Sequence, residues 1–321
     1  MKEHSDEVKC LAQLSNELIA SGSKDTNINI WNIQTGTLVK KLIGHTGPIT
    51  SLVSLENDQL ASSSTMDSTI RIWNIQSGEQ MRMIEDPVST LVSLKDGRLA
   101  SASKELIKIW DVETGFLMNT LNAHEKNVNS MVVLPKKNLL ISGSSDKTII
   151  LWDLFTFELK LTLADHQSAI TTLTVCSNGL LASGSWDHTI KLWNISRDDD
   201  KLVQTIQNDQ MYAVRSLASL QNGYLASGSF DFSDTHIYIW NPKDGSLIET
   251  LKEHSGVINA LITLTNGQLV SGSADNSIKI WANPHKTDTT ISLPILTKST
   301  SQIGIEFSKK KKMVHLSTNP M

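Results

Sequence analysis

The sequence has few cysteines and no long apolar run, and these absences exclude several classes of protein. It has 321 residues but only two cysteines, Cys10 and Cys176, too few for a disulfide framework. No run of 18 apolar residues could span a membrane, and the charged start, MKEHSDEVKC, lacks the apolar core of a signal peptide. We therefore predict free, buried thiols in a reducing compartment, the cytoplasm with the nucleus as the alternative, and no membrane partner.

A strong charge of either sign is also missing. The net charge is −4, and residues 297–321 carry five lysines against one glutamate, or +4, which leaves −8 for the rest. A mildly acidic body is unlike a phosphate-binding surface, so we expect no nucleic-acid partner. No long segment shows the 3.6-residue apolar period of a helix, and strand-forming residues dominate instead.

What the sequence does contain is a repeated unit. Residues 181–193, LASGSWDHTIKLW, join two short apolar runs by a tight polar turn, which predicts two antiparallel strands. Seven of the eight tryptophans hold the same place in seven such units: Trp31, Trp73, Trp110, Trp152, Trp193, Trp240 and Trp281. Their spacings are 42, 37, 42, 41, 47 and 41 residues. A repeat of about 40 residues with four short strands is typical of a propeller blade.

An aspartate and a histidine recur at fixed places in the unit. Six copies have the aspartate six residues before the tryptophan, and five of these have a histidine about 20 residues earlier. The five complete sets are His4, Asp25 and Trp31; His45, Asp67 and Trp73; His124, Asp146 and Trp152; His166, Ser183, Asp187 and Trp193; and His254, Asp275 and Trp281. With this pattern the chain resembles the WD-repeat propeller family over about nine-tenths of its length. The resemblance implies an all-β fold, a seven-bladed WD-repeat β-propeller with four antiparallel strands per blade.

The ring is expected to be one domain, residues 1–296, followed by a tail, 297–321, that is partly ordered or disordered. Three residues precede His4, which is too short for an N-terminal strand that completes the last blade. The segment 289–296, TTISLPIL, is the candidate for that strand, and the seal would then rest on packing between blades one and seven. A missing preceding strand is the alternative.

Blades three and six depart from the pattern. Blade three has no histidine and carries Glu105 where the aspartate is expected. In blade six Asp209 or Gln210 stands in the histidine position. Both Asp231 and Asp234 could be its structural aspartate, and the distance to Trp240 favours Asp234.

Serine, histidine and aspartate in every complete blade could be taken for a catalytic set. The resemblance instead implies a hydrogen-bonded chain inside the blade, from Asp to His, His to Ser and Ser to the indole N–H, which satisfies buried polar groups. A nucleophile is needed once, whereas this set occurs five times, so we predict no enzyme activity. Each blade offers one His and one Asp, and no phosphate loop precedes a helix, so we predict no metal site and no cofactor.

Partners of this family commonly dock on the face formed by two kinds of loop. Carried over to this chain, the turn before the structural aspartate holds Lys24, Met66, Lys104, Ser145, Trp186, Ala274, and Phe230 or Ser233. The loop positions on either side of the first apolar residue of the inner strand hold Glu7 and Lys9, Pro48 and Thr50, Pro87 and Ser89, Asn127 and Asn129, Ala169 and Thr171, Ala213 and Arg215, and Val257 and Asn259. Large aromatic residues and an arginine gather in blades five and six, as expected of a binding hot spot. We therefore predict a partner-binding set of Met66, Trp186, Tyr212, Arg215, Phe230 and Phe232.

The expected function is that of a monomeric, non-catalytic scaffold with a protein or peptide partner on one face. The alternative within the same class is a substrate-recognition or core subunit of a ubiquitin-ligase, RNA-processing or chromatin complex. A nucleic-acid binder would need a basic face with aromatics, and a propeller enzyme would need acids or histidines around the central channel. The structural alternative is that the aromatics are filler, with Phe232 under its own turn and Trp186 on Tyr212.

Overall fold

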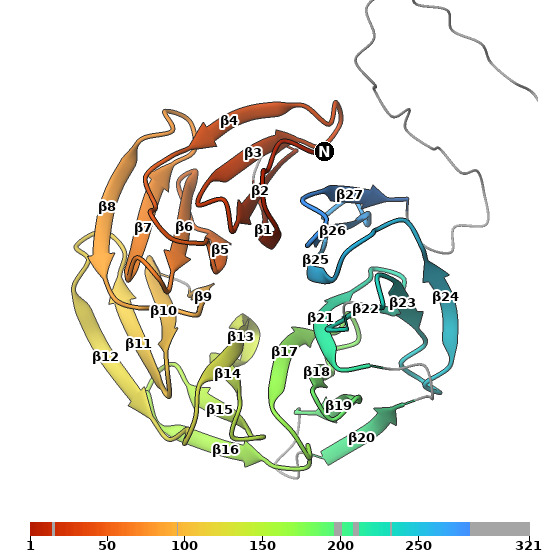
Figure 1. Cartoon of the computed structure of the whole chain (residues 1–321). Helices are drawn as coiled ribbons and strands as arrows, with labels where there is room; N and C mark the ends of the chain where they lie inside the picture. Colours follow the sequence, from red (N-terminus) through yellow and green to blue (C-terminus); the bar gives the residue numbers. More distant parts are fainter. Residues whose placement is uncertain (15–16, 95, 196–200, 208–211, 232, 283–321) are drawn as a thin grey trace, which may run out of the picture. The chain divides into compact units, whose positions relative to one another are not determined.

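Seven antiparallel sheets are arranged around a central opening (Figure 1). The computed structural model describes residues 1–14, 17–94, 96–195, 201–207, 212–231 and 233–282. Six sheets have four strands in chain order, and the seventh has three described strands. The predicted all-β, seven-bladed propeller with four antiparallel strands per blade is confirmed.

The blades follow the order of the chain. Blade one contains β1 (Val8–Gln13), β2 (Leu18–Ser23), β3 (Ile28–Asn32) and β4 (Leu38–Leu42). Blade two contains β5 (Ser51–Ser54), β6 (Gln59–Ser64), β7 (Thr69–Asn74) and β8 (Gln80–Glu85). Blade three contains β9 (Thr90–Ser93), β10 (Arg98–Ser103), β11 (Leu106–Asp111) and β12 (Leu117–Asn122). Blade four contains β13 (Val128–Leu134), β14 (Leu139–Ser144), β15 (Ile149–Asp153) and β16 (Leu159–Leu163).

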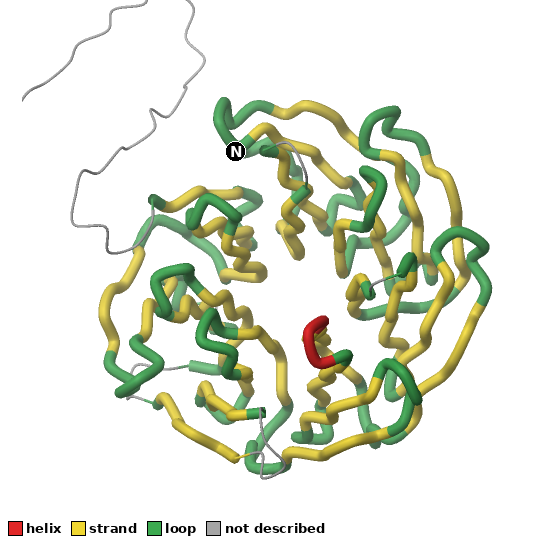
Figure 2. Tube along the Cα trace, turned by 180° about the vertical axis from the view of Figure 1, so that it is seen from behind, coloured by secondary structure: helices red, strands yellow, loops and turns green. Residues whose placement is uncertain are grey.

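Three further blades complete the ring. Blade five contains β17 (Ile170–Val175), β18 (Leu181–Ser185), β19 (Ile190–Asn194) and β20 (Lys201–Ile206). Blade six contains β21 (Val214–Ser219), β22 (Leu225–Ser229), β23 (Ile237–Trp240) and β24 (Leu247–Leu251). Blade seven contains β25 (Ile258–Thr263), β26 (Leu269–Ser273) and β27 (Ile278–Trp281). One short 3-10 helix, η1 (Pro135–Lys137), lies between β13 and β14 (Figure 2).

The hydrophobic core lies between neighbouring blades. Trp73 of blade two belongs to the same buried cluster as Ile28 and Ile30 on β3 of blade one. The other tryptophans repeat this arrangement, and at the seam Trp31 of blade one shares a cluster with Ile278 of blade seven. A sheet with two apolar faces must bury both, so each blade depends on the neighbours on either side.

A glycine on the second strand lets the next blade approach closely. A Cβ built on Gly143 would lie 2.6 Å from Cγ2 of Ile170, the first residue of the next inner strand. The five blades with glycine at this place have a register shift at the start of the inner strand, which marks a β-bulge. Blades two and three carry Ser63 and Ala102 instead, and their inner strands show no such shift.

We call the position immediately after the first apolar residue of each inner segment the bulge position, after the five blades that have a bulge there, and in five blades its side chain links the blade to the next. Asn129 Nδ2 donates to Ile170 O at 2.7 Å, and Asn259 Nδ2 donates to Val8 O at 3.0 Å. Thr50, Ser89 and Thr171 each donate a hydroxyl hydrogen bond to the backbone oxygen of the first apolar residue in the next blade: Val88, Val128 and Val214. We call these contacts the inner belt. They show that five of the fourteen loop positions predicted to face a partner have a side chain bonded to the next blade.

The inner belt is complete even where its usual donor is replaced. Blades one and six have Lys9 and Arg215 at the bulge position, and there the following residue donates instead. Ser216 Oγ donates to Ile258 O at 3.1 Å, and Cys10 Sγ lies 3.9 Å from Ile49 O. Every joint between neighbouring blades is therefore bridged, while the side chains of Lys9 and Arg215 are released from this role.

The prediction that packing alone seals blades one and seven is wrong. The α-amino group of Met1 donates to Ile278 O at 3.0 Å, and Ile278 N donates to Met1 O at the same distance. Met1 therefore pairs with β27 as Leu42 and Leu163, at the ends of outer strands, pair with their third strands. The candidate strand 289–296, the boundary at 296 and the tail 297–321 lie outside the described residues.

The glycine contact can be tested by a double-mutant cycle. We expect Gly143→Ala to lower the free energy of unfolding by about 1–3 kcal/mol, because the added methyl would overlap Ile170. Ile170→Ala alone should cost about 2–5 kcal/mol, since it opens a cavity. In the double variant the loss should be smaller than the sum, because the new methyl fills part of that cavity. Denaturant unfolding of the four proteins measures this, and additive losses would contradict the contact.

Candidate functional site

Five blades contain the same hydrogen-bonded tetrad of Asp, His, Ser and Trp. In blade five, His166 Nδ1 lies 2.7 Å from Asp187 Oδ2, and His166 Nε2 lies 2.7 Å from Ser183 Oγ. Trp193 Nε1 donates to Ser183 Oγ at 2.8 Å. The tetrads of blades one, two, four and seven have the same contacts.

These contacts assign the protons within each tetrad. The indole N–H donates to the serine oxygen, and Nδ1–H of the histidine donates to the ionised aspartate, which can only accept. Burial alone would raise the pKa of Asp187, but hydrogen bonds from His166 and Thr189 outweigh it and hold that pKa well below the ordinary range. Ser183 is fully buried, and its hydroxyl already has three partners: His166, Trp193 and the backbone oxygen of Lys191. The tetrad is thus a closed structural network with no accessible nucleophile.

Blade three uses a different pair of residues in place of the tetrad histidine. Lys108 Nζ donates to Asp86 Oδ1 at 2.6 Å, and the other oxygen of Asp86 lies 3.5 Å from Ser101 Oγ. Trp110 Nε1 donates to Ser101 Oγ at 2.8 Å, as in the complete blades. The sequence analysis considered Glu105 and missed Asp86. The available signal was the lysine two residues before the tryptophan, which also pairs with an acidic residue in blades five and seven.

Blade six contains a buried carboxylate with one oxygen unused. Asp234, which is 2% exposed, accepts hydrogen bonds on Oδ1 from His236 and Tyr238. Burial and the nearby Asp234 raise the pKa of Tyr238 to about 12. Oδ2 has no hydrogen-bond partner among the described residues. Residues 208–211, which include the two candidates for the histidine position, lie outside them.

In the lengthened turn of blade six, Phe230, and not Ser233, is the structural equivalent of Trp186. Trp186 N donates to Ala169 O at 3.0 Å, and Phe230 N makes the same bond to Ala213 O at 2.7 Å. Asp231 N then donates to Ser229 Oγ at 3.0 Å, as Asp187 N does to Ser185. The three additional residues therefore lie between Phe230 and the buried Asp234.

Three of the predicted partner-binding residues form one cluster. The rings of Trp186 and Phe230 meet edge to face with centroids 5.5 Å apart, and Arg215 Cζ lies 4.7 Å from the Phe230 centroid. We call Trp186, Arg215 and Phe230 the aromatic cluster. The ring that Trp186 contacts is that of Phe230, whereas the filler hypothesis placed Tyr212 there.

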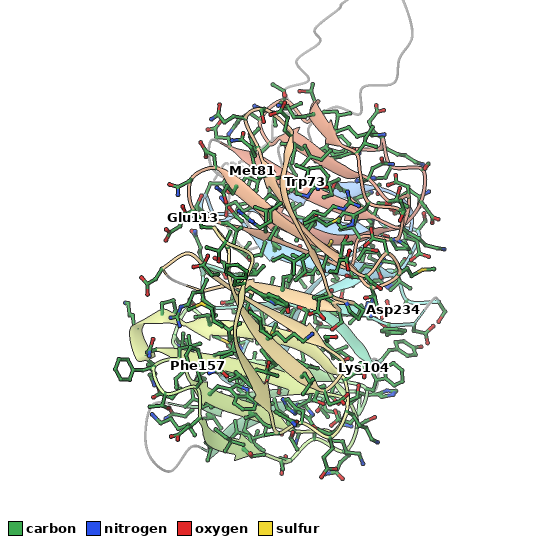
Figure 3. The ribbon with its side chains drawn as sticks, turned by 90° about the vertical axis from the view of Figure 1, so that its left-hand side faces the viewer. Trp73, Met81, Lys104, Glu113, Phe157 and Asp234 are labelled. Carbon is green, nitrogen blue, oxygen red and sulfur yellow. The ribbon has the colours of Figure 1, made fainter. Side chains whose placement is uncertain are left out.

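The aromatic cluster borders a cavity of about 830 Å³ at one end of the central channel. The cavity is lined by residues of six inner strands, including Lys9 and Arg215, by Ser89 just before the inner strand of blade three, and by Lys126. Figure 3 shows Lys104 and Asp234, which belong to the same class of turn as Trp186, on one face of the ring and Glu113 and Phe157 on the other. Met66, 79% exposed, and Tyr212, 42% exposed, do not line the cavity, and Phe232 lies outside the described residues.

Metal ligands and thiols offer no further site in the described part of the chain. No group of three His, Cys, Asp or Glu side chains lies close enough there to hold a metal ion. No described helix is long and apolar enough to cross a membrane. Both cysteines are free: Cys10 is half-buried in β1, and Cys176 is buried one residue past the end of β17, not inside it. Burial raises the pKa of both thiols to about 12, so they are protonated at neutral pH.

The tetrads predict that stability falls in mild acid. Burial lowers the pKa of His4, His45 and His124 below the usual 6.5, despite the neighbouring carboxylates. Below about pH 6.5 the unfolded chain takes up protons that the folded chain does not, so the free energy of unfolding must decrease as the pH falls. We expect the melting temperature to be level above pH 7 and to drop between pH 6.5 and 5.

Calorimetry across this pH range, with His124→Gln beside the wild type, measures the effect. The variant should be less stable at pH 7.5 but should lose less on acidification, because one of the three histidines is gone. A melting temperature that stays constant from pH 7.5 to 5.5 would contradict the assignment of neutral histidines.

Comparison with known proteins agrees with this architecture. The family described as "WD domain, G-beta repeat" matches residues 1–32, 36–74, 115–153, 157–194 and 245–282, more than half of the chain. Most of blades three and six, the two without the tetrad histidine, fall outside these matches.

Relatives share the repeats at modest identity. Periodic tryptophan protein 2 of Arabidopsis thaliana is 25% identical over 55% of this chain and 20% of its own length. Autophagy-related protein 16 of Arabidopsis thaliana is 23% identical over 50% of this chain and 32% of its own length. Nuclear distribution protein PAC1 of Coccidioides posadasii is 31% identical over 49% of this chain and 37% of its own length. These matches cover between 20% and 37% of the relatives' own lengths. The family model covers more than half of this chain, and the chain therefore belongs to the WD-repeat proteins.

Proposed function

We propose that this propeller is a non-catalytic platform that binds a protein or peptide partner at the channel end bordered by the aromatic cluster. The observation that carries the proposal is Trp186, a tryptophan that is 50% exposed beside a cavity. The equivalent turn in other blades holds Lys24, Ser145 or Ala274, so the fold does not require an aromatic there. Exposed tryptophan and arginine are the side chains most often found at the centre of binding hot spots.

The remaining residues of the predicted set would lie at the edge of this proposed binding site. Tyr212 is on the same sector of the ring, in the loop that precedes β21, and Met66 is on the turn of blade two. Phe232 stays a prediction. A partner centred on Trp186 would reach Tyr212 first, so we expect Tyr212 to contribute more than Met66.

A nucleic-acid partner is disfavoured by the pairing of two lysines of this face, Lys9 and Lys24. Lys9 forms an ion pair with Glu7, and Lys24 lies 3.7 Å from carboxylate oxygens of both Asp6 and Glu7. Their charges are therefore balanced locally and are not available to neutralise phosphates. An enzyme is disfavoured because the serine and histidine side chains of the tetrads are closed inside the blades.

The wider setting is also a proposal. Relatives named for autophagy and for nuclear distribution match this chain over 32% and 37% of their own lengths. A role for this chain as a subunit of a multiprotein complex is the alternative form of the same function. Two free thiols suit a reducing compartment, and we propose the cytoplasm, with the nucleus as second choice. A monomeric propeller also stays a proposal.

Affinity capture from cell lysate with matched variants tests the location of the site. We expect Trp186→Ala to reduce retention of specific partners at least about 30-fold, as loss of a hot-spot residue does. The control is Phe155→Ala, which removes an 85% exposed aromatic from the β15–β16 turn near Phe157, on the other face (Figure 3). Both variants should melt like the wild type. Partners lost equally from both variants, or from neither, would contradict a site at Trp186.

A further inference from the structure

Arg215 has a cationic side chain that does not take part in the inner belt. It stands at the bulge position, where five other blades use the side chain to bridge to the next blade. In blade six that bridge is made by Ser216 instead. The guanidinium has no hydrogen bond or ion pair among the described residues, and its contact is the face of Phe230.

Lys9, the other released cation, differs from Arg215 in this respect. Its ammonium is paired with Glu7, which Lys24 also approaches. Glu7 is the acidic group whose charge acts on Arg215, and it is already engaged by these two lysines. Burial lowers the pKa of Arg215. The cavity therefore contains one half-buried guanidinium with no ion pair among the described residues.

The geometry of Arg215 suits a carboxylate. Stacking on Phe230 leaves the N–H edge of the planar guanidinium free, and that edge matches the two oxygens of a carboxylate in a bidentate pair. One carboxylate balances one guanidinium, whereas a phosphate monoester carries nearly two charges and would need a second buried cation. Lys126, which also lines the cavity, is exposed, and Asp231 on the neighbouring turn adds negative charge.

We propose that the partner is a peptide segment that inserts a glutamate or aspartate side chain into the channel mouth. Its carboxylate pairs with Arg215, and an adjacent apolar side chain packs on Trp186. The cavity of about 830 Å³ is of the size that holds a few side chains. This inference rests on the proposed function, because it names the ligand of the same site.

Three peptide pools test the inference. Each pool has seven-residue peptides with uncharged residues at random in the flanking positions, and the central residue is glutamate, glutamine or phosphoserine. The wild-type protein is immobilised, and bound peptides are identified by mass spectrometry. We expect at least tenfold more retention from the glutamate pool than from the glutamine pool. The best glutamate peptide is then made singly, and its Kd is measured with each variant.

Variants separate the role of Arg215 from general charge. Arg215→Met should weaken binding of the glutamate peptide at least about 30-fold, as loss of one partner of a desolvated charge pair does. Arg215→Lys keeps the charge but not the planar fork and should weaken it about tenfold. Lys126→Met, a second cation lining the cavity, should change the Kd less than threefold. Since Ser216 carries the belt contact, the Arg215 variants should melt like the wild type.

The outcomes distinguish this inference from the proposed function. Equal retention of the glutamate and glutamine pools, preference for phosphoserine, or a glutamate preference that survives Arg215→Met would each overturn the carboxylate assignment. If Trp186→Ala still lowers retention of every pool in those cases, the proposed binding platform stands and only the carboxylate assignment is lost. If the wild type retains no pool, and Trp186→Ala changes no partner in lysate, both are overturned.

Discussion

Burial of each tryptophan against the preceding blade is the constraint on which the whole ring depends. The indole of Trp73 lies against Ile28 and Ile30 of blade one, and the indole of Trp31 lies against blade seven. A blade alone would leave this surface in water, so its stability is mostly that of its two interfaces. The tetrad serves the same packing, because it gives the buried indole N–H an acceptor through Ser and anchors the turn through His and Asp.

The sequence predicts the repeated part of this structure well because repetition makes each weak signal strong. Seven tryptophans at nearly even spacing define the blades, and five copies of His, Asp and Trp define the tetrads. Prediction fails where a contact has no fixed sequence signature. The substitution of Asp86 and Lys108 for a histidine in blade three needed the strand register, and the pairing of Met1 with Ile278 needed the ring to be closed.

The candidate site shows the same division. The sequence identified Trp186, Arg215 and Phe230 as unusual, because aromatics and arginine stand where other blades have small or polar residues. It could not show that Thr50, Asn129 and their equivalents are engaged between blades, since these bonds depend on how neighbouring blades are placed. The structure thereby reduces the predicted partner-binding face to the side chains that make no inner-belt hydrogen bond.

The inner belt also has a weakest link, which gives the ring a preferred place to open. Six of its joints use a hydroxyl or amide donor, but the joint between blades one and two uses the thiol of Cys10, 3.9 Å from Ile49 O. A thiol is a weak donor, and this bond is the longest of the seven. Under tension or heat, blades one and two should therefore separate before blades one and seven do. Amide hydrogen exchange that is faster around Ile49 than around Val8 would reveal it.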